Sequence, residues 1–307
     1  MRVRQLRLGI CRPEFVDIEG IGKGNDGMMR LATCNEPWNG VASIEEVFRI
    51  AARIGFEGVE IAPFTLADHA DDISVARRKE IVRAAADAGV KIVGLHWLFV
   101  SPKGLHMTTP DTAVRQKSID YLKSLTNLCG DLGGTIMILG SPKQRSIEPP
   151  TTHEEGWKRM RDILAACGNV LAERNVDLCI EALAPSETNF VQTLDEASRM
   201  ADEVGHPKVG VMLDVKAMSS MPDGIMGTIR KFGKRTRHFH ANHPSLKGVG
   251  MPLEPGDGEP VDWSAILLAL DQTGFDGWVS CEPFVYKPDP TTVAEVAYTT
   301  LKAAMPK

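Results

Sequence analysis

The chain has 307 residues, a length that one large α/β domain can use in full, so we expect a single domain over residues 1–307. Its formal net charge of −5 disfavours a nucleic-acid partner, because such partners bind basic faces. No window approaches the roughly 18 apolar residues that a membrane helix needs, and the N-terminus shows no secretory signal. The six cysteines have neither paired nor zinc-finger spacing, which is typical of reduced, cytoplasmic proteins.

One order of elements repeats along the chain: a helix that ends near glycine, a short apolar strand, and then a polar loop. After a first strand at residues 6–10, Ser43 is placed to cap a helix that Gly55 ends, and Gly89 ends the next helix in the same way. The pattern then predicts a last helix at 291–304 and further strands at 59–61, 91–96, within GGTIMILG (133–140), and at 178–181, 211–214, 238–240 and 279–282.

Strands that alternate with helices at this spacing are expected to be parallel, with the helices as crossovers. Eight such units predict an α/β fold, a single closed (β/α)8 TIM barrel with its active site at the C-terminal face of the strands. An open, doubly wound sheet is the alternative, but no GxGxxG motif follows the first strand. The long loops all follow strands and should therefore gather on that one face: 11–41, 100–112, 141–154 and 241–261.

Four successive strands end on side chains that can bind a metal: Glu181, Asp214, His240 and Glu282. Because side chains alternate along a strand, each of these groups can point into the barrel mouth while its neighbour faces the helices. Three carboxylates that converge there would repel one another, and a divalent cation would remove the conflict. Oxygen and imidazole ligands suit one Mn²⁺, Mg²⁺ or Co²⁺ ion, with Zn²⁺ left open. The alternative is that each acid caps a helix or pairs with a lysine.

Several other side chains stand beside the expected mouth. His96 ends its strand, where it could shuttle a proton or hold a hydroxyl group, or else have a structural role. Trp97 could form a wall against a sugar face, or pack in the core. Lys216 has the parity of an inward residue, although an exposed lysine is the alternative. The stretch GSPKQR, with Gln144 and Arg145, could bind a phosphate or carboxylate of the substrate, or be a solvated loop.

Two more polar residues are expected away from the reacting centre. His238 lies two residues before His240 on the same strand face, so we expect it one layer deeper, in a supporting or packing role. Glu60 ends the strand at 59–61, but the following Ala-Pro-Phe is apolar, and we therefore leave Glu60 outside the site.

Four segments carry a resemblance to a known family: CIEALAPSET, VMLDVKAM, RHFHANHP and GFDGWVSCEPF. They are similar to the blocks around the last four strands of the xylose isomerase-like TIM-barrel superfamily, which includes sugar isomerases and epimerases with a single metal site. The resemblance implies that Glu181, Asp214, His240 and Glu282 hold the metal, and that Glu181 and Glu282 also act as catalytic base and acid. It further implies that Glu187 contacts the substrate.

The resemblance implies a divalent-metal-dependent isomerase or epimerase for a sugar, keto-sugar or polyol ketone, which removes a proton next to a metal-polarised carbonyl. A lyase of the same superfamily, of the inosose or dehydroshikimate dehydratase type, is the alternative. Ketose 3-epimerases carry His and Arg, which hold substrate oxygens, where this chain has Ala217 and Leu246. The acidic chain and its few histidines disfavour the DNA-cleaving branch, and the metal quartet disfavours a non-catalytic sugar-binding module. Family members are often homodimers or homotetramers, so either state is expected here.

Overall fold

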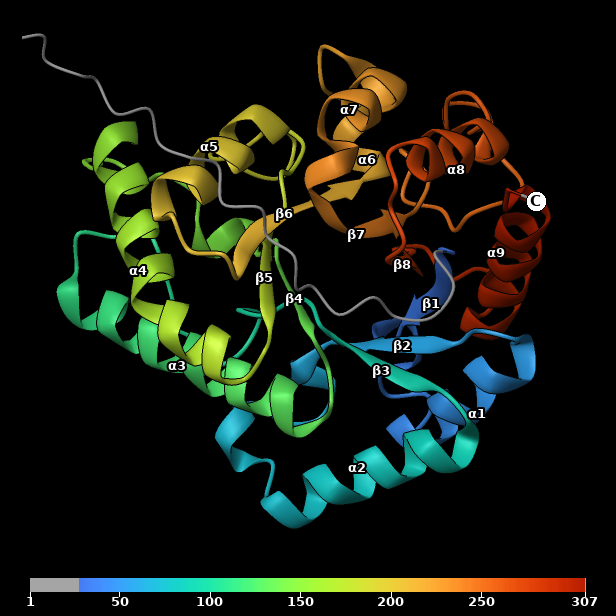
Figure 1. Ribbon diagram of the computed structural model, residues 1–307, viewed down its shortest axis with the longest axis horizontal. Coiled ribbons are helices and arrows are strands. Elements are labelled where there is room, and N and C mark those ends of the chain that lie inside the picture. The colour runs from blue at the N-terminus through green and yellow to red at the C-terminus, as the bar shows by residue number, and fades with distance from the viewer. Residues whose placement is uncertain (1–27, 307) are drawn as a thin grey trace, which may run out of the picture.

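The computed structural model describes residues 28–306, and this part of the chain forms eight parallel strands closed into a barrel (Figure 1). Each strand pairs with the next, and β8 pairs with β1. Closure confirms the predicted (β/α)8 TIM barrel and excludes the open sheet. The strands are β1 Arg30–Cys34, β2 Gly58–Ile61, β3 Lys91–Leu95, β4 Ile136–Leu139, β5 Asp177–Ile180, β6 Val209–Asp214, β7 Thr236–Ala241 and β8 Trp278–Cys281.

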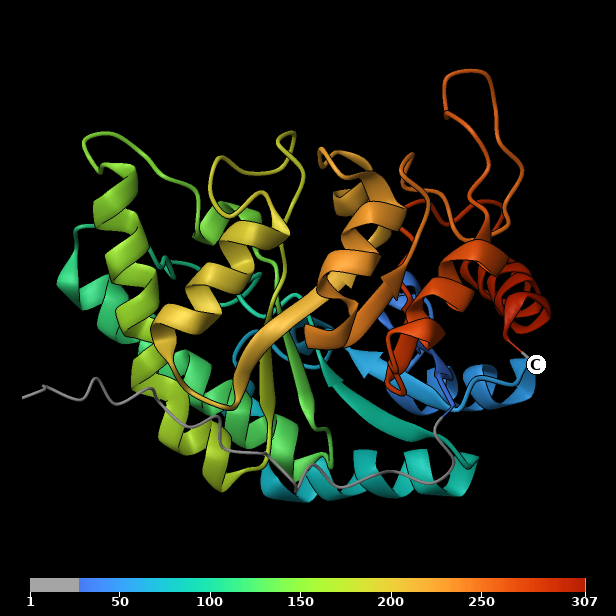
Figure 2. The ribbon, with the colours of Figure 1, turned by 45° about the horizontal axis from the view of Figure 1, so that its top comes forward.

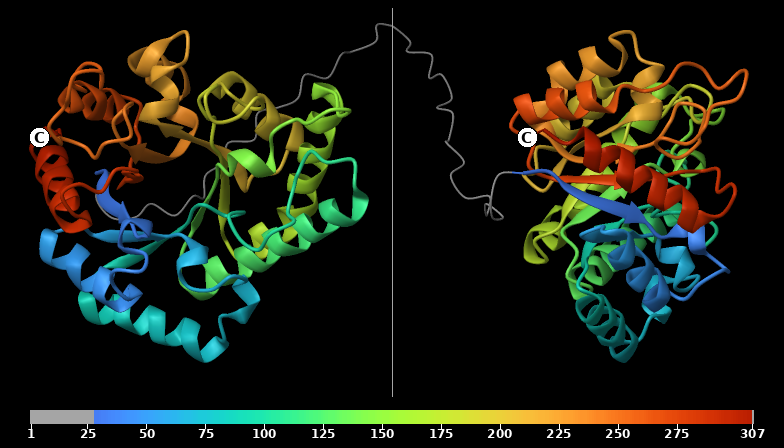
Figure 3. Two further views of the ribbon diagram at one scale, coloured as in Figure 1. Left: turned by 180° about the vertical axis from the view of Figure 1, so that it is seen from behind. Right: turned by 90° about the vertical axis from the view of Figure 1, so that its right-hand side faces the viewer.

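Helices form a ring outside the strands (Figure 1). Figure 3 shows α9 beside β1 and α1, so the last helix covers the seam where the barrel closes. Between residues 28 and 306, no helix is both long and apolar enough to cross a membrane. The helices are α1 Ile44–Ile54, α2 Val75–Ala88, α3 Thr112–Asp131, α4 His153–Glu173, α5 Leu194–Val204, α6 Val215–Ser219, α7 Gly224–Phe232, α8 Trp263–Gln272 and α9 Pro290–Ala304.

The helix boundaries follow local signals in the sequence. The Ser43 side chain accepts a hydrogen bond from the Glu46 backbone N–H at the start of α1. Gly55 and Gly89 end α1 and α2 with φ angles of 115° and 79°, in the left-handed region that glycine adopts without a Cβ clash. Both predicted stops are therefore confirmed.

The first barrel strand lies later in the chain than the sequence suggested. The expected strand at 6–10 falls outside the described residues, and β1 at Arg30–Cys34 occupies part of what we expected to be a loop at 11–41. Backbone pairing decides the matter, because Leu31 lies opposite Val279 of β8 and Ala32 lies opposite Gly58 of β2. Both stretches, LRLGI and RLATC, are short and apolar, so their composition alone does not distinguish them.

Strand parity is as predicted in the second half of the barrel. Cys179 and Met212 pack together in a small apolar cluster inside the barrel, with residues of β4. Ile180, Leu213 and Cys281 instead belong to the large cluster between the strands and the helices. Glu181 and Asp214 lie two residues after Cys179 and Met212 along the chain. Their side chains therefore point to the same side, into the mouth of the barrel.

The loops that follow the strands lie at one end of the barrel. Figure 2 shows the loops after β4, β5 and β7 together at the top, above the C-terminal ends of the strands. Main-chain and side-chain hydrogen bonds join neighbouring loops there: Met107 N donates to Gln144 O at 2.7 Å, and Phe99 N donates to Ser141 Oγ at 3.2 Å. The loops after β3 and β4 are thus tied together beside the mouth.

Replacing Gly94 tests the tight approach of β3 to β4. A Cβ at Gly94 would lie 1.8 Å from the Ile136 carbonyl oxygen, which is backbone and has little room to move. We expect Gly94→Ala to lower the free energy of unfolding by about 3 kcal/mol or more. Gly89→Ala is the control, because a Cβ there meets nothing within 4 Å and only the left-handed backbone is strained, at about 1 kcal/mol. Equal losses in urea unfolding would contradict the steric argument.

Candidate metal and catalytic site

Four side chains from the last strands converge at the mouth: Glu181, Asp214, His240 and Glu282. Each offers one ligand atom, and these atoms all lie within 4.8 Å of one another. Their residues are between 0% and 7% exposed. Asp214 and His240 end or nearly end β6 and β7, whereas Glu181 and Glu282 directly follow β5 and β8. The predicted set is therefore brought together in space by the strand ends.

His240 is held from behind by a buried carboxylate. Its Nε2 lies 3.1 Å from Glu60 Oε1, while the other oxygen of Glu60 lies 2.7 Å from His238 Nε2. All three side chains are fully buried. Glu60 therefore directs the other ring nitrogen of His240, Nδ1, toward the quartet, as outer carboxylates do for metal-binding histidines. His238 lies below His240, as expected. Glu60, which we left outside the site, contacts His240, a member of the quartet, although it does not line the cavity.

Both oxygens of Asp214 are fixed by neighbouring groups. The backbone N–H of Ala217 donates to Oδ1 at 2.7 Å, because Asp214 is also the N-cap of α6. The side-chain amide of Asn242 donates to Oδ2 at 2.6 Å, and its own oxygen accepts from the backbone N–H of Lys216. Asn242 lies two residues after His240 and therefore shares its direction, a parity signal that the sequence analysis did not use.

Glu282 receives two side chains from the end of β3. Trp97 Nε1 donates to Glu282 Oε1 at 3.0 Å, and His96 Nδ1 lies 3.4 Å from the same oxygen. The other ring nitrogen of His96 lies 3.0 Å from Glu36 Oε2, in the short helix at Glu36–Trp38 that follows β1. The sequence analysis missed Glu36, because it fell in a segment that was expected to be a loop far from its strand.

These contacts separate the acidities of the buried groups. Burial, together with the nearby Glu181 and Glu282, raises the pKa of Asp214 to about 7. Burial also raises the pKa of Glu181 above its usual value. For Glu282, burial acts in the same direction, but His240 and His96 outweigh it and bring the pKa to about 2. The pKa of His240 is raised well above its usual value because Glu282 and Glu60 outweigh burial.

A divalent cation fits this donor set. His240 Nδ1 lies 3.0 Å from Glu282 Oε2, yet it has no hydrogen-bond partner among the described residues. Three carboxylates share the same small volume, and their mutual repulsion is what a cation would remove. Oxygen donors with one imidazole match the ligands that Mn²⁺, Mg²⁺ and Co²⁺ accept.

A cavity of about 230 Å³ opens beside the quartet. Three of the four quartet residues line it, together with Trp97 and Phe284, whose ring centroids lie 5.9 Å apart. The predicted contact residues His96, Gln144, Glu187 and Lys216 also lie on its wall. Lys216 Nζ forms an ion pair with Glu187 Oε1 at 2.6 Å. The cavity is of a size that suits a small molecule.

Arg145 does not reach the cavity, so the expectation that it binds substrate directly is corrected. It is fully buried, and its Nη1 donates to the Glu181 carbonyl oxygen at 2.6 Å. Its second amino group lies 3.4 Å from the carbonyl oxygen of Val191. Hydrogen bonds to these carbonyl oxygens hold the side chain inward, behind a member of the quartet.

At the two positions where ketose 3-epimerases carry His and Arg, this chain has Ala217 and Leu246. Neither residue brings a cationic side chain into the cavity. Ala217 is buried and contributes its backbone N–H to Asp214. Leu246 has a φ of 72°, and the adjacent Lys247 pairs with Asp257 at 2.7 Å.

In the protein without metal, the ionisation of Asp214 makes the free energy of unfolding depend on pH. Its pKa is raised in the fold from 3.8 to about 7, so the folded state binds a proton that the unfolded state has already lost. The bound proton stabilises the folded state fully at pH values below the unfolded pKa. This stabilisation, up to about 4 kcal/mol, is lost as the pH rises toward 7. With EDTA present, we expect this loss in urea unfolding to be smaller in Asp214→Asn than in the wild type, and the part that remains comes from Glu181, whose pKa is also raised.

Asp276→Asn is the matched control, because Asp276 is exposed and precedes β8, at the opposite end of the barrel. It should keep the wild-type slope with pH. A wild-type slope in Asp214→Asn would contradict the assignment.

Mn²⁺ should stabilise the wild type more at pH 7.5 than at pH 5, because ligands must lose protons to bind metal.

The sequence model of the xylose isomerase-like TIM-barrel family matches residues 48–303. Two curated relatives are similar over most of the chain. A fructoselysine 3-epimerase of Escherichia coli O157:H7 is 22% identical over 265 residues, 86% of this chain and 94% of that protein. A probable ketose 3-epimerase of Synechocystis is 25% identical over 248 residues, 79% of each chain.

Solved structures share the fold at low sequence identity. D-psicose 3-epimerase of Clostridium cellulolyticum H10, solved with D-tagatose, has a TM-score of 0.75 at 22% identity, over 90% of this chain and 98% of its own. The 3-keto-D-glucoside 4-epimerase of E. coli also gives 0.75, at 18% identity, over 90% and 99%. Because the family model spans most of the sequence, this chain belongs to the xylose isomerase-like TIM-barrel family.

Proposed function

We propose that this protein is a divalent-metal-dependent epimerase or isomerase for a sugar, keto-sugar or polyol ketone. The observation that carries the proposal is the pair Glu181 and Glu282, two buried carboxylates on the wall of one small cavity, within the same four-residue set of potential metal ligands. The two curated relatives, which are 3-epimerases by name, support the same reaction class. Mn²⁺, Mg²⁺ or Co²⁺ would be held by Glu181, Asp214, His240 and Glu282.

The metal, when bound, would polarise the substrate carbonyl and make the neighbouring C–H bond more acidic. Glu181 and Glu282 then remove a proton from that carbon and return one to it. Their surroundings differ, because burial raises the pKa of Glu181 while His240 and His96 more than offset burial at Glu282. Opposite shifts in a carboxylate pair are typical of groups that divide base and acid roles, and Glu181 is the stronger base of the two.

The remaining cavity residues would hold the substrate. Trp97 and Phe284 offer an apolar wall, and the ion pair between Lys216 and Glu187 offers both a donor and an acceptor for hydroxyl groups. Gln144 lies on the wall formed by the loop after β4. The Trp97 N–H also holds Glu282 in place, so this residue would position a catalytic group as well as the sugar.

A lyase reaction is the second candidate, because His96 lines the cavity beside Glu282. Burial would lower its pKa, but Glu36 and Glu282 outweigh that cost and raise it to about 10. A protonated imidazole beside Glu282 could protonate a departing hydroxyl group after the first proton is removed. Ala217 and Leu246, in place of the epimerase His and Arg, are compatible with such a different use of the site.

Deuterium exchange from D₂O tests the proposed chemistry. With Mn²⁺, we expect exchange next to the carbonyl in at least one member of a panel of ketoses, 3-keto-sugars and inososes. Glu181→Gln and Glu282→Gln should each slow it by about 100-fold or more, and EDTA should abolish it. Glu173→Gln on the exposed face of α4 is the control and should leave the rate unchanged.

Exchange at the wild-type rate in either variant, or in EDTA, would refute the assignment of the quartet. Metal binding by each variant should be measured by thermal shift, so that loss of a ligand is separated from loss of a base. The appearance of enone absorbance in place of an epimer would identify the lyase.

A further inference from the structure

We propose that the substrate carries an anionic group, a carboxylate or a phosphate, on the end that lies beneath the loops after β3 and β4. The inference builds on the proposed function, since it assigns a substrate class to the same cavity. It comes from the distribution of charged side chains on the cavity wall, which is uneven between the metal-binding side and the side formed by these two loops.

The acidic residues of the wall are accounted for without the substrate. Glu181, Asp214 and Glu282 are the carboxylates of the quartet, where a divalent cation fits. Glu187 has its own partner in Lys216, at 2.6 Å. Among the described residues of the wall, no carboxylate is therefore left to neutralise a further cation.

Two lysines of the wall remain, and both belong to the loops after β3 and β4. Lys103 and Lys143 are exposed, line the cavity, and form no ion pair with any residue between 28 and 306. The other lysine of the wall, Lys216, follows β6 and is paired with Glu187. The cavity therefore has a cationic side and a metal-binding side, and a small substrate would face both.

The two lysines are carried by segments that are tied to each other. Met107 N donates to Gln144 O at 2.7 Å, and Phe99 N donates to Ser141 Oγ at 3.2 Å, so hydrogen bonds join the loops that carry Lys103 and Lys143. A pair of ammonium groups on joined loops is suited to a group with several acceptor oxygens. At about 230 Å³, the cavity favours an anion on the sugar itself over an anionic macromolecule.

Three sugars that differ only at C6 provide the test: D-fructose, D-fructuronate and D-fructose 6-phosphate. Their affinities for the full chain loaded with Mn²⁺ should be measured by calorimetry, at low and at high NaCl concentration. We expect at least one anionic sugar to bind about tenfold more tightly than D-fructose. High salt should reduce this preference, since both lysines are exposed. The preferred C6 group distinguishes carboxylate from phosphate.

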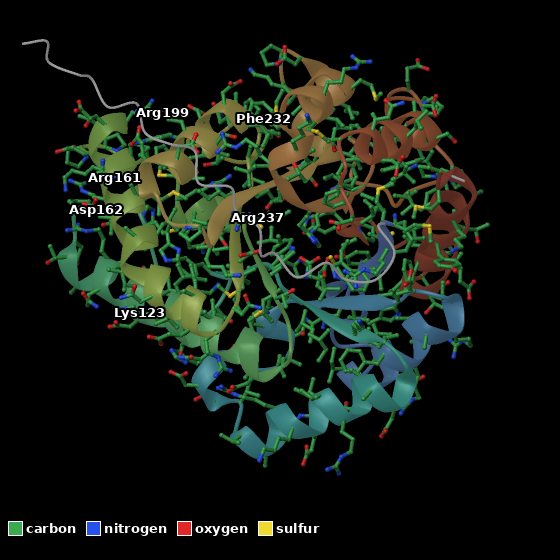
Figure 4. All side chains as sticks on the ribbon, viewed as in Figure 1. Lys123, Arg161, Asp162, Arg199, Phe232 and Arg237 are labelled. Carbon is green, nitrogen blue, oxygen red and sulfur yellow. The ribbon has the colours of Figure 1, made fainter. Side chains whose placement is uncertain are left out.

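The double variant Lys103→Gln/Lys143→Gln should reduce the preference to within about twofold of D-fructose. Lys123→Gln is the matched control, because Lys123 lies on α3 in the outer ring of helices (Figure 4) and is not on the cavity wall. It should keep the full preference. Equal affinities of the three sugars, no measurable binding of either anion, or a preference that persists in the double variant would overturn the proposal.

The outcome is separable from that of the proposed reaction. Deuterium exchange on D-fructose without any preference for anions would keep the proposed function and refute this inference. A preference for anions that the double variant removes, without exchange on any sugar, would support the anion subsite while the proposed function fails.

Discussion

The burial of three carboxylates at one end of the barrel is the constraint on which the rest of the site depends. Glu181, Asp214 and Glu282 are almost wholly buried. A negative charge costs more free energy in such a buried position than in water. The surrounding groups respond to that cost. Glu60 fixes the orientation of His240, the amide of Asn242 and the start of α6 hold Asp214, and Arg145 places a cation behind Glu181.

The same constraint explains the conformation at the end of β3. Trp97 has a φ of 52°, which is rare for a bulky residue and costs of order 1–3 kcal/mol. In this conformation its indole N–H reaches Glu282 while its ring faces Phe284 across the cavity wall. Backbone strain of this kind is stable only where the surrounding contacts fix it, and here the contacts are those of the candidate site.

Much of this could be predicted from the sequence, for physical reasons that also explain the failures. Period-two alternation places Glu181 and Asp214 inward, and the left-handed glycines at 55 and 89 end helices regardless of tertiary context. The first strand was misplaced because only pairing with β2 and β8 distinguishes RLATC from LRLGI. Glu36 was missed as a result. The inward turn of Arg145 depends on carbonyl groups from separate loops, which no local pattern reveals.

The cavity is assembled from two halves of the chain. The quartet comes from the ends of β5 to β8, whereas Trp97, Lys103 and Lys143 come from loops in the first half. The strand ends are rigid parts of the barrel, and the loops sit on its rim. If the loops after β3 and β4 were replaced by other loops of equal length, the cavity would admit different molecules, and the reacting groups at the strand ends would stay in place. The barrel is therefore a suitable parent for directed evolution toward new substrates, with variation confined to residues 98–107 and 141–144, so that Arg145 keeps its contact with Glu181.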